Sequence, residues 1–268
     1  MNRRVVVFLL VVVATFSVQR AMAWAAFGHG AIAYVAEQHL TPEAKSEVRR
    51  YLKHTLPFYA SWMDHWRAVE PYAHTNMWHG IKSDEKGKLR WDISGERANG
   101  QAMIQVKRIV EEMKDYRNMP DSLVRQNVIY LIHSVADMHC PVHVQFPKTT
   151  YPHYRYNLKR NGKKYAMHSF WDAVPDFTRK NWTYERYAKE VDVLTAKHVK
   201  RILKGNYDVW GKDILKQTHR AYQITPADKD VAKMTAEERA EALNLGDEMA
   251  MKAAYRLAYI LNTIFDAK

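Results

Sequence analysis

The sequence predicts an all-α protein, a single multi-helix domain with one small β-hairpin. Three observations support this. Apolar residues recur at helical spacing through most of the chain after residue 23. One segment alone, 154–166, alternates Tyr, Leu and Lys residues around an Asn161-Gly162 turn, which is typical of a hairpin. No internal repeat or linker divides the remainder, so we expect one domain over residues 24–268.

The first 23 residues have the pattern of a secretory signal peptide. Asn2-Arg3-Arg4 precedes an apolar run from Val5 to Val13, and Ala21-Met22-Ala23 offers a small-residue cleavage site. The apolar run is too short for a membrane span. We expect cleavage after Ala23 and a secreted or periplasmic protein. Trp24 would then carry a free α-amino group, which can bind a metal once it is deprotonated.

The expected helices follow in chain order. Helical patterns cover residues 28–39, 41–52, 60–69, 98–116, 122–137, 184–203, 209–221 and 236–264. Thr41 is of a residue type preferred at the N-cap, and Pro42 is a good first helical residue. Thr235 and Glu238 form the pattern of a capping box at the start of the last helix. In the 122–137 helix, the apolar side consists of Leu123, Val124, Val128, Leu131, Ile132 and Val135.

The chain is basic, with 41 Lys and Arg residues against 29 Asp and Glu residues and a net charge of +12. Removal of the signal peptide takes away three arginines and no acidic residue, which lowers this charge by three to +9. A basic surface suits a polyanion such as nucleic acid, or an anionic membrane surface. The net charge does not distinguish a nucleic acid from a membrane surface as the partner.

Cys140 is the one cysteine, so no intramolecular disulfide can form even after export. A thiol at this position is a possible soft zinc ligand. We favour the interpretation that Cys140 is a small buried residue among the ligands.

Ionisable residues are concentrated in an apolar segment around residues 131–143. His133 and Asp137 are four residues apart, so they project from one face of the predicted helix and can bind one metal ion. Pro141 ends the helix, which lets His143 approach the same pocket from another direction. A lone buried histidine is more often a hydrogen-bonded core group. Several such groups in one apolar run instead favour a metal site or an active site.

Further donors of the same type lie before and after this segment. His29 follows Trp24 by five residues, and His74 follows Asp64 by ten. His168 and Asp172 repeat the four-residue His/Asp spacing. Nitrogen and oxygen donors of this kind suit zinc sites that keep positions open for water and substrate. The candidate donors are Trp24, His29, Asp64, His74, His133, Asp137, His143, His168 and Asp172.

These donors form ordered motifs: Trp24-x4-His29, Ala-Ser-Trp-x-Asp64-x2-Arg67, His74, His133-x3-Asp137-x-His-x-Pro-x-His143 and His168-x2-Trp-Asp172. The series resembles the zinc-dependent single-strand-specific nucleases of fungi, plants and bacteria, the S1/P1 type. It implies the helical fold that these nucleases share with zinc phospholipase C. It also implies three zinc ions per chain: one held by Asp64, His74, His133 and Asp137, a second held by Trp24 and His29 and bridged by Asp137, and a third held by His143, His168 and Asp172.

The resemblance implies an endonuclease that cleaves single-stranded DNA and RNA and leaves 5′-phosphorylated products. Two zinc ions roughly 3.5–4 Å apart can lower the pKa of a shared water and so make a bridging hydroxide for in-line attack. The third would stabilise the leaving oxygen. Arg67, one turn after Asp64, is the candidate for neutralising transition-state charge, with Asp64 and Asp137 completing the catalytic set. No stable protein partner is implied.

The chain departs from the family pattern at several positions. The usual His-Tyr/Phe-x-Asn segment appears here as His74-Thr-Asn76, and the segment 149–156 lacks the usual Gly-Gly-Asn. Cys140 stands where Gln is common. Asn76 is a candidate substrate-binding residue, together with the nearby aromatic residues Tyr72 and Trp78, and ordinary loop packing is the alternative. These departures bear on substrate specificity more than on metal binding.

Two other functions remain open. Zinc phospholipase C resembles the nucleases but has a longer spacing from Trp to the first His, and Glu usually replaces the last Asp. Trp24-x4-His29 and Asp172 therefore favour the nuclease, with phospholipid as an alternative substrate. A noncatalytic exported protein that binds zinc or nucleic acid would need closed zinc sites or a blocked groove, and Arg67 argues against it.

Overall fold

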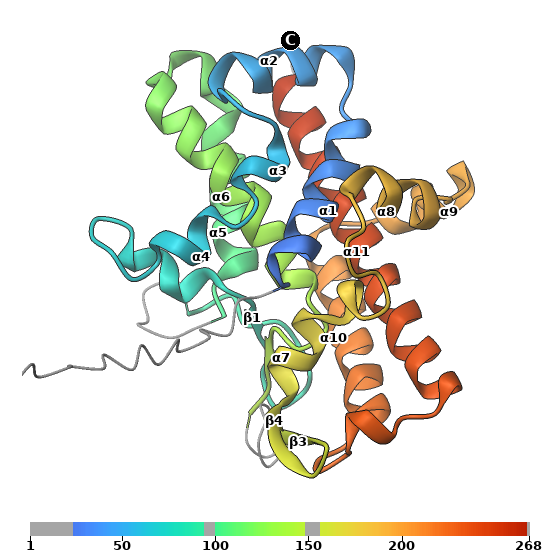
Figure 1. The fold of residues 1–268 in the computed structure, drawn as a ribbon. Coiled ribbons are helices and arrows are strands. Elements are labelled where there is room, and N and C mark those ends of the chain that lie inside the picture. The colour runs from blue at the N-terminus through green and yellow to red at the C-terminus, as the bar shows by residue number, and fades with distance from the viewer. Residues whose placement is uncertain (1–23, 94–99, 148–155, 267–268) are drawn as a thin grey trace, which may run out of the picture.

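The computed structural model describes residues 24–93, 100–147 and 156–266. The expected signal peptide, the first two residues of the expected helix 98–116, and most of the segment 149–156 lie outside these ranges. The regular structure of the described part is helical apart from two small pairs of strands, which confirms the predicted all-α class (Figure 1). None of the described helices combines the length and the apolar character needed to cross a membrane.

The α-helices, in chain order, are α1 (Ala26–Gln38), α2 (Pro42–Tyr51), α3 (Leu56–Tyr59), α4 (Trp62–Trp66), α5 (Ala102–Glu112), α6 (Asp121–His139), α7 (Met167–Asp172), α8 (Tyr184–Val191), α9 (Ala196–Leu203), α10 (Tyr207–Ile224) and α11 (Ala236–Phe265). Short 3-10 helices are η1 (Ala73–Trp78), η2 (Met113–Asn118), η3 (Val174–Asp176) and η4 (Val231–Lys233). Strands β1 (Ile81–Lys82) and β2 (Val144–Gln145) pair in parallel, and β3 (Asn157–Arg160) and β4 (Lys163–Ala166) form the predicted hairpin.

Capping residues define the helix starts that the sequence predicts. The Thr41 hydroxyl accepts a hydrogen bond from the Ala44 amide at 3.1 Å, with Pro42 as the first residue of α2. At α11, the Glu238 amide donates to the Thr235 hydroxyl and the Thr235 amide donates to the Glu238 carboxylate. All three hydrogen bonds satisfy amides that have no partner within the helix, and the two at α11 form a complete capping box.

Helices α1, α6 and α11 pack against one another in the middle of the molecule (Figure 1). Every residue of α6 from 127 to 139 is buried, on all sides of the helix. The apolar ones among them belong to a single hydrophobic cluster with residues of α1 and α11. The same packing carries the polar residues of this half of α6 into the interior, where they require partners.

The expected helix 184–203 is instead two helices. Thr195 caps α9, because its hydroxyl accepts a hydrogen bond from the His198 amide. Just before it, the Asp192 carboxylate accepts a hydrogen bond from the Tyr255 hydroxyl at 2.6 Å and lies 2.7 Å from a ring nitrogen of His39. These contacts hold the connecting residues in a non-helical conformation. The expected helix 60–69 is likewise shorter, and forms only α4.

Candidate metal centre

The C-terminal half of α6 provides the middle of the site. His133 and Asp137 lie one turn apart and are both fully buried. His29 of α1 stacks on the His133 ring, with ring centroids 4.4 Å apart, and its Nε2 lies 3.2 Å from Asp137 Oδ1. His133 Nδ1 lies 2.7 Å from the carbonyl oxygen of Ala60. In the tautomer that donates this hydrogen bond, His133 Nε2 is left as a lone-pair donor facing the carboxylates.

Helix α4 adds a second buried carboxylate. Asp64 Oδ2 lies 3.8 Å from His29 Nε2, and Asp64 Oδ1 lies 3.9 Å from His133 Nε2. Arg67, one turn later, places a guanidinium nitrogen 3.5 Å from Asp64 Oδ1 and keeps 17% of its side chain exposed. Arg67 therefore stands between the buried cluster and solvent.

Of the expected set, His74 does not lie in this cluster, and His79 lies there instead. His79 Nδ1 lies 2.6 Å from Asp137 Oδ2 and 3.2 Å from His133 Nε2. His74 is exposed in η1, where its Nδ1 lies 2.8 Å from the carbonyl oxygen of Pro71. The chain approaches the buried carboxylates only after η1 has ended, so the earlier histidine faces outward.

Gly80 allows His79 to take this position. Its φ is +100°, a conformation that side-chain-bearing residues rarely adopt, and a Cβ at this residue would lie 3.1 Å from the His143 carbonyl carbon. Directly after it, the Ile81 amide donates a hydrogen bond to the His143 carbonyl oxygen at 2.8 Å. The sequence signal for His79 was this adjacent glycine, which marks a close backbone approach.

A second group of donors lies where α7 meets the turn after α6. The Nε2 atoms of His143 and His168 face one another 2.5 Å apart. Asp172 lies 3.8 Å from His143 Nε2 and 3.6 Å from His168 Nδ1. The Cys140 thiol lies 3.5 Å from Asp172 Oδ1. His143 Nδ1 also lies 3.8 Å from Asp137 Oδ2, so the two groups adjoin.

Trp24 lies beside both groups. Its side chain is fully buried, and its indole nitrogen donates a hydrogen bond to the carbonyl oxygen of Ala136 at 2.9 Å. The Ala25 amide donates to the carbonyl oxygen of Asp172 at 2.8 Å. The chain at residue 24 is thus anchored to α6 on one side and to α7 on the other.

The donor atoms fit a metal ion. Among the described residues, both ring nitrogens of His29 and both carboxylate oxygens of Asp64 are buried without a hydrogen-bond partner. Such atoms are costly in a protein interior unless something satisfies them. Nitrogen and oxygen donors in this arrangement suit zinc. Groups whose donor atoms lie within 4.8 Å of one another are His29, His133 and Asp137; Asp64, His79 and His133; and Cys140, His143 and Asp172.

The electrostatics of the cluster favour a positive charge within it. Burial raises the pKa of Asp137, but the imidazoles of His133, His143 and His79 lower it well below its usual range. Burial lowers the pKa of His133, yet Asp137 and Asp64 raise it to about 9. The cluster therefore stabilises a proton on an imidazole, and a metal cation would supply the same charge.

The proposed base-binding residues lie at the edge of this region. Asn76 is exposed in η1. Tyr72 packs edge-on against Trp62, with ring centroids 4.7 Å apart, and Trp78 packs edge-on against Tyr130 at 5.1 Å. The two expected aromatic residues thus belong to a group of rings beside α4, while Asn76 faces solvent next to it.

Comparisons with known proteins identify the family of the chain. The family model described as S1/P1 nuclease matches residues 24–266. Nuclease P1 from Penicillium citrinum and nuclease PA3 from Penicillium sp are each 26% identical to this chain over 158 residues. The matched region covers 56% of this chain and 57% of each relative, so the match spans little more than half the length of these proteins.

Proposed function

Since the chain belongs to the S1/P1 nuclease family, we propose that it is a zinc-dependent nuclease, which cleaves single-stranded DNA and RNA and leaves 5′-phosphorylated products. The observation that carries the proposal is the buried cluster of His29, Asp64, His79, His133 and Asp137. Its unsatisfied donor atoms match the needs of a metal ion. The sequence resemblance stated above supplies the class of reaction.

We assign three zinc ions to the chain. Asp64, His79, His133 and Asp137 would hold one; Trp24 and His29 would hold a second, with Asp137 shared between them; and His143, His168 and Asp172 would hold the third. Bound zinc supplies positive charge and lowers the pKa of coordinated water, which provides the nucleophile for attack on a phosphodiester. Trp24 contributes its amino group only after cleavage at Ala23, so export and activity are linked in this proposal.

The side chains around the cluster have separate roles. The Ala60 carbonyl fixes the orientation of the His133 ring through the 2.7 Å contact, as outer partners of metal-binding histidines commonly do. The Arg67 guanidinium lies 3.5 Å from Asp64 and reaches the surface. The role proposed for it is to bind phosphoryl oxygens and to stabilise their charge in the transition state, a task that its planar fork suits.

Selectivity for single strands is proposed from the rings beside α4. Trp66 is 43% exposed and lies 6.1 Å from Trp62 between ring centroids. Nucleic-acid bases stack on such side chains only when they are not paired. Asn76, exposed in η1, is the proposed hydrogen-bonding partner of a stacked base. The basic net charge supports a polyanionic substrate.

The experiment is hydrolysis of a single-stranded DNA oligonucleotide by protein that begins at Trp24. The reaction is measured with zinc, after chelation, and on the duplex of the same sequence. We expect zinc-dependent cleavage of the single strand, 5′-phosphates on the products, and loss of activity in Asp137→Asn. Arg67→Ala should lower kcat about 100-fold or more while zinc content is unchanged. If the zinc-loaded protein leaves the oligonucleotide intact and hydrolyses phosphatidylcholine, the proposed nuclease activity is wrong and the protein is a phospholipase.

A further inference from the structure

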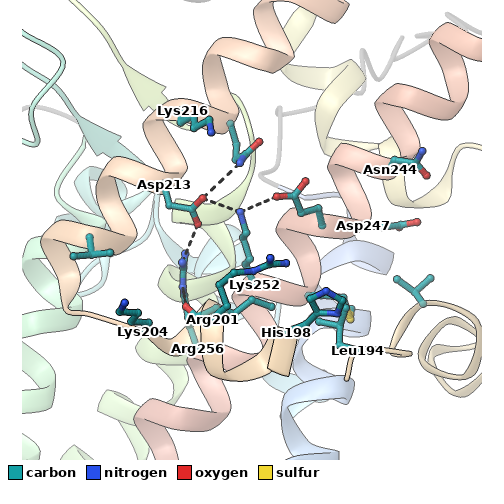
Figure 2. A pocket seen from close by; sticks show the side chains of 16 residues that line it. Leu194, His198, Arg201, Lys204, Asp213, Lys216, Asn244, Asp247, Lys252 and Arg256 are labelled. Carbon is teal, nitrogen blue, oxygen red and sulfur yellow. Dashed lines mark hydrogen bonds and ion pairs between the residues drawn. The ribbon is translucent and has the colours of Figure 1, made fainter. Parts of the chain in front are cut away.

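A cavity of about 630 Å³ lies where α9, α10 and α11 converge (Figure 2). No proposed zinc ligand lines it. It lies behind the metal centre, because Arg256 in its lining donates a hydrogen bond to Nε2 of His139 at 2.8 Å. His139 and Asp137 are two residues apart on α6, so their side chains leave nearly opposite faces of the helix. The cavity is therefore separate from the proposed catalytic site.

Ion pairs compensate the acidic side chains of the cavity. Asp213 of α10 lies 2.8 Å from Lys252 and 2.9 Å from Arg256, both on α11 (Figure 2). Lys252 also lies 2.8 Å from Glu248. The third acidic residue, Asp247, is paired from outside the cavity by Arg179. None of the three carboxylates is left to attract a further cation.

The basic side chains exceed these carboxylates. The lining contains five Lys and Arg residues and three acidic residues. Within the described ranges of the chain, Arg201, Lys204 and Lys216 have neither a hydrogen bond nor an ion pair through their side chains, and all three are exposed. Arg201 and Lys204 come from α9 and its end, and Lys216 comes from α10, so the unpaired positive charge lies on the α9 and α10 sides of the cavity. Uncompensated positive charge within concave walls attracts small anions strongly.

The remaining lining residues indicate the size and type of the anion. Leu194, Ile202, Val209 and Met251 give the cavity an aliphatic wall. Its volume is that of pockets for small organic molecules, roughly 300–1,000 Å³, and exceeds what an inorganic ion needs. Its lining has no Phe, Tyr or Trp. His198 is its one aromatic ring, so the wall offers successive bases little stacking surface, which disfavours a site that tracks a nucleic-acid strand.

We propose that this cavity is a second, noncatalytic site that binds a small phosphate monoester. The dianionic phosphate matches the excess of two positive charges in the lining, and Arg201 offers the fork that binds phosphate in pairs of hydrogen bonds. The organic part lies against the aliphatic wall. A nucleoside monophosphate and a sugar phosphate share this chemistry. The inference rests on the cavity alone and does not depend on the proposed nuclease activity.

The test is calorimetric titration of the zinc-loaded protein with adenosine 5′-monophosphate, glycerol 3-phosphate and inorganic phosphate. Because phosphate also binds zinc, the cavity is identified by a pair of variants. Arg201→Ala removes a lining charge, and Lys200→Ala removes an equal charge from the same helix outside the lining. We expect two binding events in the wild type and in Lys200→Ala. In Arg201→Ala one event should weaken roughly tenfold or more, with DNA hydrolysis unchanged.

Further measurements distinguish the ligand and separate the two proposals. Asp137→Asn should lose hydrolysis and keep the event that is sensitive to Arg201. Tighter binding of the nucleotide than of glycerol phosphate would identify a nucleotide site, and the reverse a sugar-phosphate site. Equal binding by Arg201→Ala and Lys200→Ala would overturn the assignment. A single binding event in the wild type would also overturn the assignment, as would binding of inorganic phosphate that is as tight as that of both esters.

Discussion

Gly80→Ala should destabilise the protein and disturb the metal centre together. At φ +100°, any residue with a side chain is strained by about 1–2 kcal/mol. The new methyl group would also collide with the His143 carbonyl group, and overpacking against such rigid backbone costs about 1–3 kcal/mol. Alanine also restricts the unfolded chain more than glycine does, which offsets about 0.4–1 kcal/mol of this destabilisation. The free energy of unfolding should therefore fall by about 2–4 kcal/mol.

Gly87→Ala is the matched control. Gly87 also has a positive φ, +68°, but nothing lies within 4 Å of the position that its Cβ would occupy. This variant retains the backbone strain and lacks the collision, so its cost should be about 1 kcal/mol. The difference between the two variants isolates the close approach of Gly80 to His143.

The assay is urea unfolding of both variants, with zinc content measured on the same samples. Gly80→Ala should also lose zinc, because relief of the collision moves His79 or His143, the residues on either side of the contact. Gly87→Ala should keep its zinc. Equal destabilisation by the two substitutions, with equal zinc content, would refute the argument that Gly80 is needed for this contact.

Three further predictions follow from the site and its surroundings. His79→Ala should lower zinc affinity by at least 10–100-fold, whereas His74→Ala should leave it unchanged by equilibrium dialysis; the opposite order would restore His74 as a ligand. Burial raises the pKa of the Cys140 thiol well above its usual value, so it stays protonated, and Cys140→Ala should keep the full zinc content by elemental analysis unless the thiol is a ligand. Burial raises the pKa of Asp213, but Lys252 and Arg256 lower it, and the net result is a pKa below the usual value. The ion pairs of Asp213 therefore stabilise the fold above about pH 4, and this stability is lost as the pH falls through the pKa of the folded state. Asp213→Asn should therefore cost about 1–3 kcal/mol at pH 7 and much less at pH 2, and a cost independent of pH in urea unfolding would contradict this.

Local chemistry made much of the fold predictable. Two helix starts are marked by Thr41 with Pro42 and by Thr235 with Glu238. The contacts at each start join residues only a few positions apart, so they can be predicted from a short piece of sequence. The hairpin around Asn161 is equally local, since this residue adopts φ +53° at the turn. The i, i+4 spacing of His133 and Asp137 likewise predicted that they share one face of α6.

Features that depend on distant partners were not predictable in the same way. The break between α8 and α9 rests partly on contacts of Asp192 with His39 and Tyr255, which are remote in sequence. The choice between His74 and His79 was decided by η1, which turns the first outward, and by the contact of Gly80 with the segment after α6. Counting donors along the chain does not reveal which of two nearby histidines faces inward.

The carboxylate of Asp137 meets four imidazoles from three stretches of chain: His29 from α1, His79 from the segment after η1, and His133 and His143 from α6 and the turn after it. Because these stretches converge only in the native structure, an unfolded chain offers no comparable site. A ligand that binds only the folded form stabilises it by about 4 kcal/mol at a thousandfold excess over its Kd. Under the proposed ligand set, the abundance of the folded protein would follow the free zinc of its surroundings, and scarcity of zinc would expose the chain to proteases.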